Sequence, residues 1–246
     1  SSSSAASDVY KRQVKSFDDD IENIKQLTTQ MATLVEEQFK LLYHVIDTAS
    51  PATIEDILDN EPRLDQYDAE IRDAVITIIT LRAPIAIDLR ASLTALRIST
   101  DLERLGDYAK SIAMRVAALE TIPDTNIKND ILRLLTLVQT QMKDVIDAYL
   151  SKDIKKAEIV RKNDLMIDEK YNLVYDVIVD QIKDKVPKLK LLTYTKLLFA
   201  IKTLERAGDH ICNIAEEIHF IVTGEDISTT KKPSQSIEKS LEGINK

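Results

Sequence analysis

An internal repeat constrains the fold of this chain more than any other feature of its sequence. The word Leu102-Glu103-Arg104-Leu105-Gly106-Asp107 recurs as Leu204-Glu205-Arg206-Ala207-Gly208-Asp209, 102 positions further on. Asn60, Asp65 and Pro84 recur as Asn163, Asp168 and Pro187, 103 positions further on. Two of the four glycines of the chain lie inside the repeated word. A repeat of this length predicts two halves of related structure.

Helical periodicity runs through both halves. Apolar residues recur three and four positions apart in long stretches, beginning with Phe17, Ile21 and Ile24, and no stretch alternates with a period of two. Prolines separate these stretches, because a proline is costly inside a helix. The pattern predicts six long helices, one from about Phe17 to Ile46 and five near 51–83, 85–120, 124–150, 152–186 and 189–223. The predicted fold is all-α, with two tandem three-helix up-down bundles that arose by internal duplication.

The repeat also predicts the division of the chain into domains. Residues 14–121 form the first three-helix bundle and residues 122–224 the second. The Ser- and Ala-rich segment 1–13 lacks an initiator Met and an apolar core, and we interpret it as a non-native or disordered leader. Residues 225–246, where the helical pattern fades, are predicted to be a tail.

Composition argues against several classes of protein. The formal net charge is -8, whereas binding to a nucleic-acid backbone requires a basic stripe, so no nucleic acid is expected as a partner. No stretch reaches the roughly 18 consecutive apolar residues of a membrane span. Cys212 is the only cysteine, so no disulfide can form within the chain, which fits a reducing compartment.

Four acid-x-x-x-acid pairs are the candidate functional residues. On a helix, two residues four apart lie on one face, where like charges repel by a few tenths of a kcal/mol, about 0.2–0.5. A bound cation would account for the repulsion, and an all-oxygen ligand set suits Mg²⁺, Mn²⁺, Ca²⁺ or iron. The alternative is a solvated acidic surface. The predicted metal ligands are Glu61, Asp65, Glu103 and Asp107 in the first half, and Asp164, Asp168, Glu205 and Asp209 in the second.

Two local features bear on these pairs. A glycine inside a helix costs about 1 kcal/mol relative to alanine, so Gly106 and Gly208 predict either close approach of a neighbouring helix or room for a ligand. Pro62 lies inside the pair Glu61/Asp65, and we expect the helix to restart or kink near Asn60, which would turn Glu61 away from Asp65.

The repeated words resemble the signatures of the PhoU family of phosphate-specific transport accessory and regulatory proteins. The resemblance is carried by the words at 101–109 and 204–210 and by the first-helix segments 16–18 and 31–38. It implies tandem three-helix bundles, with E/D-x-x-x-D motifs that bind metal clusters, iron foremost, with Mn, Zn or Mg as alternatives. It also implies a cytoplasmic homodimer that meets the membrane only through its partners.

The partners implied by the resemblance are the ATPase subunit of the phosphate transporter and a phosphate-sensing histidine kinase. The chain would act as a negative regulator of phosphate uptake and of the phosphate-starvation response, and not as an enzyme. Alternatives are a metal-free helical adaptor, a PhoU-like domain of a larger phosphate transporter, and a di-iron carboxylate oxidase. The oxidase requires two Glu-x-x-His pairs, and the sequence contains only Glu216/His219.

Overall fold

The structure, a computed structural model, describes the backbone of residues 2–48, 50–82, 84, 86–119, 124–183 and 186–227. Side chains are described from Asp18 onward, apart from that of Arg82. Most of the predicted tail, residues 228–246, therefore lies outside the described residues.

The described part of the chain consists of six α-helices and contains no strand. This confirms the all-α prediction, and the helices end within a few residues of the predicted positions. No helix among the described residues has a stretch long and apolar enough to cross a bilayer. The helices are α1 (Ser2–Thr48), α2 (Pro51–Arg82), α3 (Ala86–Ala117), α4 (Thr125–Ser151), α5 (Ile154–Lys183) and α6 (Lys188–Thr223).

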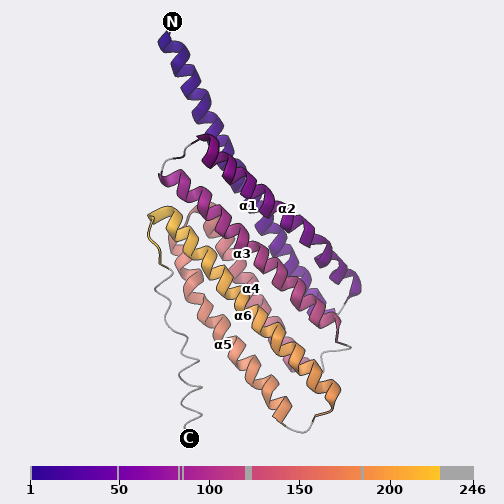
Figure 1. Cartoon of the computed structure of the whole chain (residues 1–246). Helices are drawn as coiled ribbons and strands as arrows, with labels where there is room; N and C mark the ends of the chain where they lie inside the picture. Colours follow the sequence, from indigo (N-terminus) through magenta and orange to yellow (C-terminus); the bar gives the residue numbers. More distant parts are fainter. Residues whose placement is uncertain are drawn as a thin grey trace.

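The helices pack as two three-helix units lying side by side. α1, α2 and α3 contact one another, and α4, α5 and α6 do the same. α3 packs on α6 and α1 packs on α4, so the two units share a long common interface. Figure 1 shows that all six helices run nearly along one axis, with α2 and α5 at opposite edges of the face on which α3 and α6 lie between them.

Aliphatic side chains form the core, as expected for a chain without tryptophan. Phe39 is the largest side chain that is fully buried, and it belongs to the same buried cluster as Leu42, Ile57 and Leu105. Two buried glutamines interrupt this apolar interior at matching positions of the repeat. Gln38 donates a hydrogen bond to the carbonyl oxygen of Ile57, at 3.3 Å, and Gln141 donates one to the carbonyl oxygen of Val160, at 2.9 Å.

Two expectations about helix continuity require correction. α2 runs without interruption through Pro62, although proline removes one hydrogen-bond donor from the helix. The helix therefore does not restart near Asn60. α1 begins at Ser2, so residues 2–13 are helical rather than disordered, and its N-terminal part projects beyond the other helices (Figure 1). The alternative that the leader is non-native stays a prediction.

Gly106 allows α2 to approach α3 closely. A Cβ atom at this position would lie 2.3 Å from Cδ1 of the buried Leu64 and 3.1 Å from Oε1 of Gln38. The distance to Leu64 is far below van der Waals contact and the distance to Gln38 is slightly below it, so the glycine leaves room for a core leucine and a buried amide. This confirms close helix approach as the reason for glycine here.

We predict that Gly106→Ala lowers the free energy of unfolding by about 1 kcal/mol. Overpacking a core costs roughly 1–3 kcal/mol, and the higher helix propensity of alanine offsets about 1 kcal/mol of this. Urea denaturation followed by circular dichroism measures the change. Met114→Ala, at a half-exposed position of α3, serves as the control and should stay within about 0.5 kcal/mol of the wild type. A Gly106→Ala variant more stable than the wild type would mean that Leu64 has free space to move into.

Candidate functional site

The second half brings its four predicted carboxylates together between α5 and α6. Asp164 and Asp168 lie one turn apart on α5, and Glu205 and Asp209 lie one turn apart on the neighbouring α6. The pKa of Asp168 is raised to about 6, first by burial and then by the negative charges of Asp164, Glu205 and Asp209. The four side chains therefore act on one another as a single acidic cluster.

Gly208 and Lys202 shape this second-half cluster. A Cβ atom on Gly208 would lie 2.8 Å from Oδ1 of Asp164, so the glycine lets this carboxylate rest against α6. The ammonium group of Lys202 lies 2.6 Å from Oε2 of Glu205 and 5.3 Å from the ring centroid of Tyr171. One internal cation thus offsets part of the negative charge on the α6 side.

The first half assembles a different set of carboxylates. Burial raises the pKa of Glu103, and the charges of Asp107, Asp68 and Asp65 raise it further, while Arg104 lowers it. Asp68 was not among the predicted ligands. It accepts a hydrogen bond at 2.8 Å from the hydroxyl of Ser99, which orients it between α2 and α3.

Glu61 pairs with a cation on α3. Its carboxylate forms an ion pair with the ammonium group of Lys110 on α3. Cys212 is the residue of the second half that matches Lys110 in the repeat, and it is buried in the core. The two halves therefore differ in the cations of their own chain that face the acids.

The chemistry of the second-half cluster fits a hard metal ion. Its four carboxylates supply only oxygen atoms, and their mutual repulsion favours a bound cation. Among the described residues, however, no group of three or more His, Cys, Asp or Glu side chains is already arranged to hold a metal ion. Side-chain rotations would be needed to bring several oxygens to the roughly 2.0–2.6 Å of metal ligation.

A hydrogen-bonded chain crosses the interface between α3 and α6, which joins the two halves and is called the seam below. His210 Nδ1 lies 2.7 Å from Oδ1 of Asp101, and His210 Nε2 lies 3.1 Å from the hydroxyl oxygen of Tyr108. Because a carboxylate only accepts hydrogen bonds, Nδ1 carries the proton in the neutral imidazole and Nε2 accepts from Tyr108. Arg206 covers the Tyr108 ring, with its Cζ 5.2 Å from the ring centroid. His210 is therefore a seam residue.

The seam contacts follow the symmetry of the repeat. Tyr108 and His210 occupy matching positions in the two halves and contact each other. Arg97 pairs with Glu217 at 3.0 Å, and Arg115 lies over Phe199 at 5.2 Å. Arg97 matches Phe199 in the repeat, and Arg115 matches Glu217. α3 and α6 thus pack antiparallel about an approximate two-fold axis. One end of the seam is held by an ion pair and the other by a cation–π contact.

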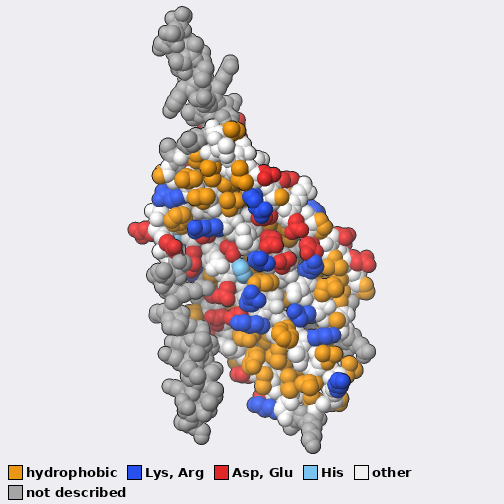
Figure 2. Space-filling model, in the orientation of Figure 1, with side chains coloured by type: hydrophobic (Ala, Val, Ile, Leu, Met, Phe, Trp, Pro, Cys, Tyr) orange, Lys and Arg blue, Asp and Glu red, His pale blue; other side chains and the backbone are white. Residues whose placement is uncertain are grey.

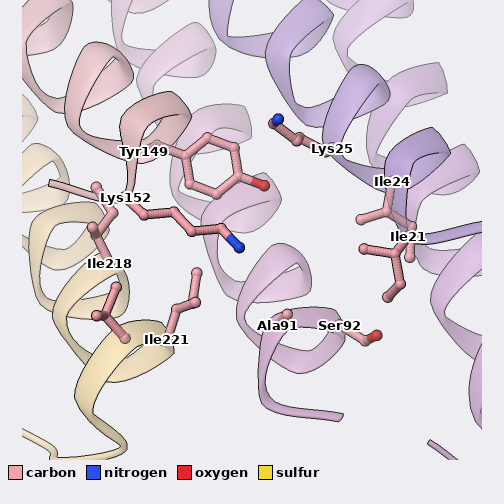
Figure 3. Close-up of a pocket in the computed structure, with 10 residues that line it drawn as sticks. Ile21, Ile24, Lys25, Ala91, Ser92, Tyr149, Lys152, Ile218 and Ile221 are labelled. Atoms are coloured by element: carbon pink, nitrogen blue, oxygen red, sulfur yellow. The ribbon is translucent and has the colours of Figure 1, made fainter. Parts of the chain in front are cut away.

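Two hollows lie outside the carboxylate clusters. One, of about 460 Å³, opens on the seam beside Asp101, Arg97 and Glu217. The other, of about 70 Å³, lies between α1, α3, α4 and α6 and is shown in Figure 3, with Tyr149 and Lys152 at its edge. The second hollow is lined by no carboxylate, so it does not suit a cation. Figure 2 shows acidic and basic side chains mixed across the middle of one face, with hydrophobic patches toward both ends.

Several residues around the clusters were missed from the sequence. Gln38 and Gln141 carry a usable signal, because they are 103 positions apart like the predicted acids. No such signal exists for Asp68, Lys110 and Lys202, because the residues at the matching positions of the other half are of a different chemical type. Only the helix contacts reveal them.

The raised pKa of Asp168 leads to a prediction about stability. Its folded pKa of about 6 exceeds the usual 3.8, so the folded chain binds more protons than the unfolded chain between these values. The free energy of unfolding therefore falls as the pH rises from about 4 to about 6 and stays reduced above that range. In chelator-treated protein, Asp168→Asn should be more stable than the wild type at pH 7.5, by roughly 1 kcal/mol after allowance for solvent screening.

Thermal and urea denaturation at pH 4.0 and pH 7.5 measure this effect. The difference between the Asp168→Asn variant and the wild type should largely disappear at pH 4.0. Asp73→Asn, at an exposed position of α2, is the control and should change stability little at either pH. An Asp168→Asn variant no more stable than the wild type at pH 7.5 would show that Asp168 is not strained by its neighbours.

Comparison with known proteins identifies the family. The PhoU domain family matches this chain twice, at residues 28–116 and 131–218. A protein of Caulobacter vibrioides, named "Phosphate-specific transport system accessory protein PhoU homolog", is 35% identical over 225 residues, which covers 91% of this chain and 96% of that protein. A protein of the same name from Zymomonas mobilis is 32% identical over 214 residues, covering 87% and 90%.

Solved structures agree with the fold. The crystal structure of PhoU from Pseudomonas aeruginosa superimposes with a TM-score of 0.79 at 25% identity, covering 85% of this chain and 100% of the other. The phosphate transport system regulatory protein PhoU from Streptococcus pneumoniae superimposes with a TM-score of 0.77 at 24% identity, covering 86% and 99%, and supports the fold alone. The doubled domain match and the two curated relatives show that this chain belongs to the PhoU family.

Proposed function

We propose that this chain is a metal-binding, non-catalytic regulator of phosphate uptake and of the phosphate-starvation response. The acidic cluster of the second half carries the metal part of the proposal. Its members are Asp164, Asp168, Glu205 and Asp209. Burial first, and then the negative charges of the other three acids, raise the pKa of Asp168 to about 6. The names of the relatives support the phosphate part, because those proteins are called phosphate-specific transport system accessory proteins.

The residues have distinct roles in this proposal. Asp164 and Asp168 from α5, with Glu205 and Asp209 from α6, would hold the second-half cation. In the first half, Asp65, Glu103 and Asp107 would do so, with Glu61 only after release from Lys110. A bound di- or trivalent ion, iron foremost and Mn, Zn or Mg as alternatives, would neutralise the carboxylates. Each pair of helices would then be fixed in register by ligands on both.

The chain would regulate its partners by binding to them. The proposed partners are the ATPase subunit of the phosphate transporter and a phosphate-sensing histidine kinase, which the chain would restrain as a negative regulator in the cytoplasm. The chain would reach the membrane only through these partners and would act as a homodimer. A bundle with a fixed surface and no requirement for a catalytic cleft suits such a role.

A metal-free adaptor is the second candidate, and two observations favour it. No described group of acids is preassembled for a metal, and Lys110 and Lys202 already offset part of the acidic charge. A PhoU-like domain of a larger phosphate transporter remains a further alternative. The di-iron oxidase has no such support, because Glu216 pairs with Arg161 while His219 lies beside Thr223 and the carbonyl oxygen of Glu225.

Elemental analysis after gel filtration without chelator tests the metal sites. The wild type should carry stoichiometric metal, and Asp107→Ala/Asp209→Ala should lose most of it, because each half loses one of its predicted ligands. Glu55→Ala/Glu158→Ala is the matched control, since these two exposed acids are also related by the repeat and remove the same charge. Unchanged metal in the Asp107→Ala/Asp209→Ala variant would reject the site assignment. An absence of metal in every sample would favour the adaptor.

Pull-down of the transporter ATPase and of the histidine kinase from the same organism tests the docking. The wild-type chain should retain both, and saturating metal should strengthen retention if the clusters fix the docking surface. The Asp107→Ala/Asp209→Ala variant separates the two claims. Retention that is unchanged in this variant would leave docking intact without metal control, and no retention by the wild type would reject these partners.

A further inference from the structure

Helix α5 presents an apolar stripe to solvent. Ile159, Met166 and Leu173 follow one another at intervals of seven residues, so they lie on one side of the helix. Their exposed fractions are 52%, 52% and 61%. A different side of α5, with Val160 and Ile167, is buried in the core. The stripe is therefore additional to the face that folds the bundle.

The matching helix of the first half shows that the fold does not need this stripe. α2 has Asp56, Arg63 and Glu70 at the three positions that correspond to the stripe in the repeat. These side chains are polar and suit a solvated surface. Because the two helices occupy equivalent places in their bundles, the apolar residues on α5 require a separate explanation.

A line of charges runs beside the stripe, and its order is self-complementary. Lys155, Lys162, Glu169 and Asp176 also follow at intervals of seven, all exposed, with the bases in the first half of the helix and the acids in the second. These four described side chains form no ion pair with one another, because like charges are adjacent and unlike charges are too far apart along the helix. A second α5 in antiparallel orientation would place bases opposite acids.

We propose that the outward face of α5 is a docking surface for α5 of a second copy of this chain, in antiparallel orientation. A two-fold axis near Met166 sets Lys162 opposite Glu169 of the other copy and Lys155 opposite Asp176. The same axis sets Ile159 opposite Leu173 and Met166 opposite its own counterpart. The apolar stripe and the line of charges thus agree on one register, and an isologous contact satisfies both.

The geometry of the bundle permits this contact. α5 lies at an edge of the molecule, away from the seam between the halves (Figure 1). The paired segment 155–176 spans roughly 30 Å at about 1.5 Å per residue. A contact made by one helix from each copy is at the small end of stable interfaces, so the dimer should dissociate in the micromolar range and weaken as salt screens the ion pairs.

This proposal rests on the homodimer of the proposed function, for which it names the contact surface, and it does not depend on bound metal or on the other partners. A monomeric wild type would remove the homodimer and leave the metal and docking parts of the proposed function untouched. The surface lies on the side of α5 away from Asp164 and Asp168, and the tests change none of the predicted ligands. The dimer can therefore be present or absent whatever the elemental analysis gives.

Sedimentation equilibrium of the full chain between 1 and 100 µM, with and without 0.5 M NaCl, tests the proposal. The wild type should dimerise, and Lys162→Glu should raise the dissociation constant at least tenfold because it sets a negative charge against Glu169 of the other copy. The swap Lys162→Glu/Glu169→Lys should restore dimerisation. Lys143→Glu, an equal charge change at an exposed position of α4, is the control and should leave the dimer unchanged.

Cross-linking locates the two-fold axis. Met166→Cys treated with a short bis-maleimide should yield a covalent dimer, because the axis brings the two thiols together. Arg63→Cys, at the matching position of α2, should yield none, and the native Cys212 is buried and should react little. A wild type that stays monomeric at 100 µM would overturn the proposal. A dimer that is insensitive to Lys162→Glu and not cross-linked through Met166→Cys would overturn it equally.

Discussion

The antiparallel contact between α3 and α6 is the interaction on which the rest of the structure depends. Each of these helices carries the signature word of its half, so their contact fixes where both acidic clusters lie. Tyr108 meets His210 at the centre of the contact, and His210 is held by Asp101. With the centre of the seam fixed in this way, α2 and α5 are left on its two sides, each supplying the remaining acids of one cluster (Figure 1).

Much of the fold could be predicted because its main signals are periodic. The repeat, the prolines and the apolar spacing were enough for six helices in two related halves. The continuity of α2 through Pro62 could not be predicted, because contacts of the whole bundle can hold a helix that its local propensity disfavours. Similarly, the start of α1 at Ser2 contradicts a disordered leader although its composition suggested one.

The candidate site was predictable in its positions and less so in its surroundings. Spacing predicted the pair Asp164 and Asp168 and the pair Glu205 and Asp209, and the structure brings these two pairs together between α5 and α6. The ion pair between Glu61 and Lys110 and the position of Asp68 near Glu103 depend on which residues of α3 face α2. Such contacts join positions some 30 to 50 residues apart with no repeated counterpart, so a single sequence carries no sign of them.

The ion pair between Glu61 and Lys110 has a consequence for how the two halves would respond to a cation. In the first half, an arriving ion competes with the ammonium group of Lys110 for Glu61, whereas in the second half it competes with the ammonium group of Lys202 for Glu205, which lies on the other helix of its cluster. Under the proposed function, two sites descended from one ancestor would then saturate at different free-ion concentrations. A protein of this kind would report ion supply over a wide range of concentrations, in two stages, instead of switching at one threshold.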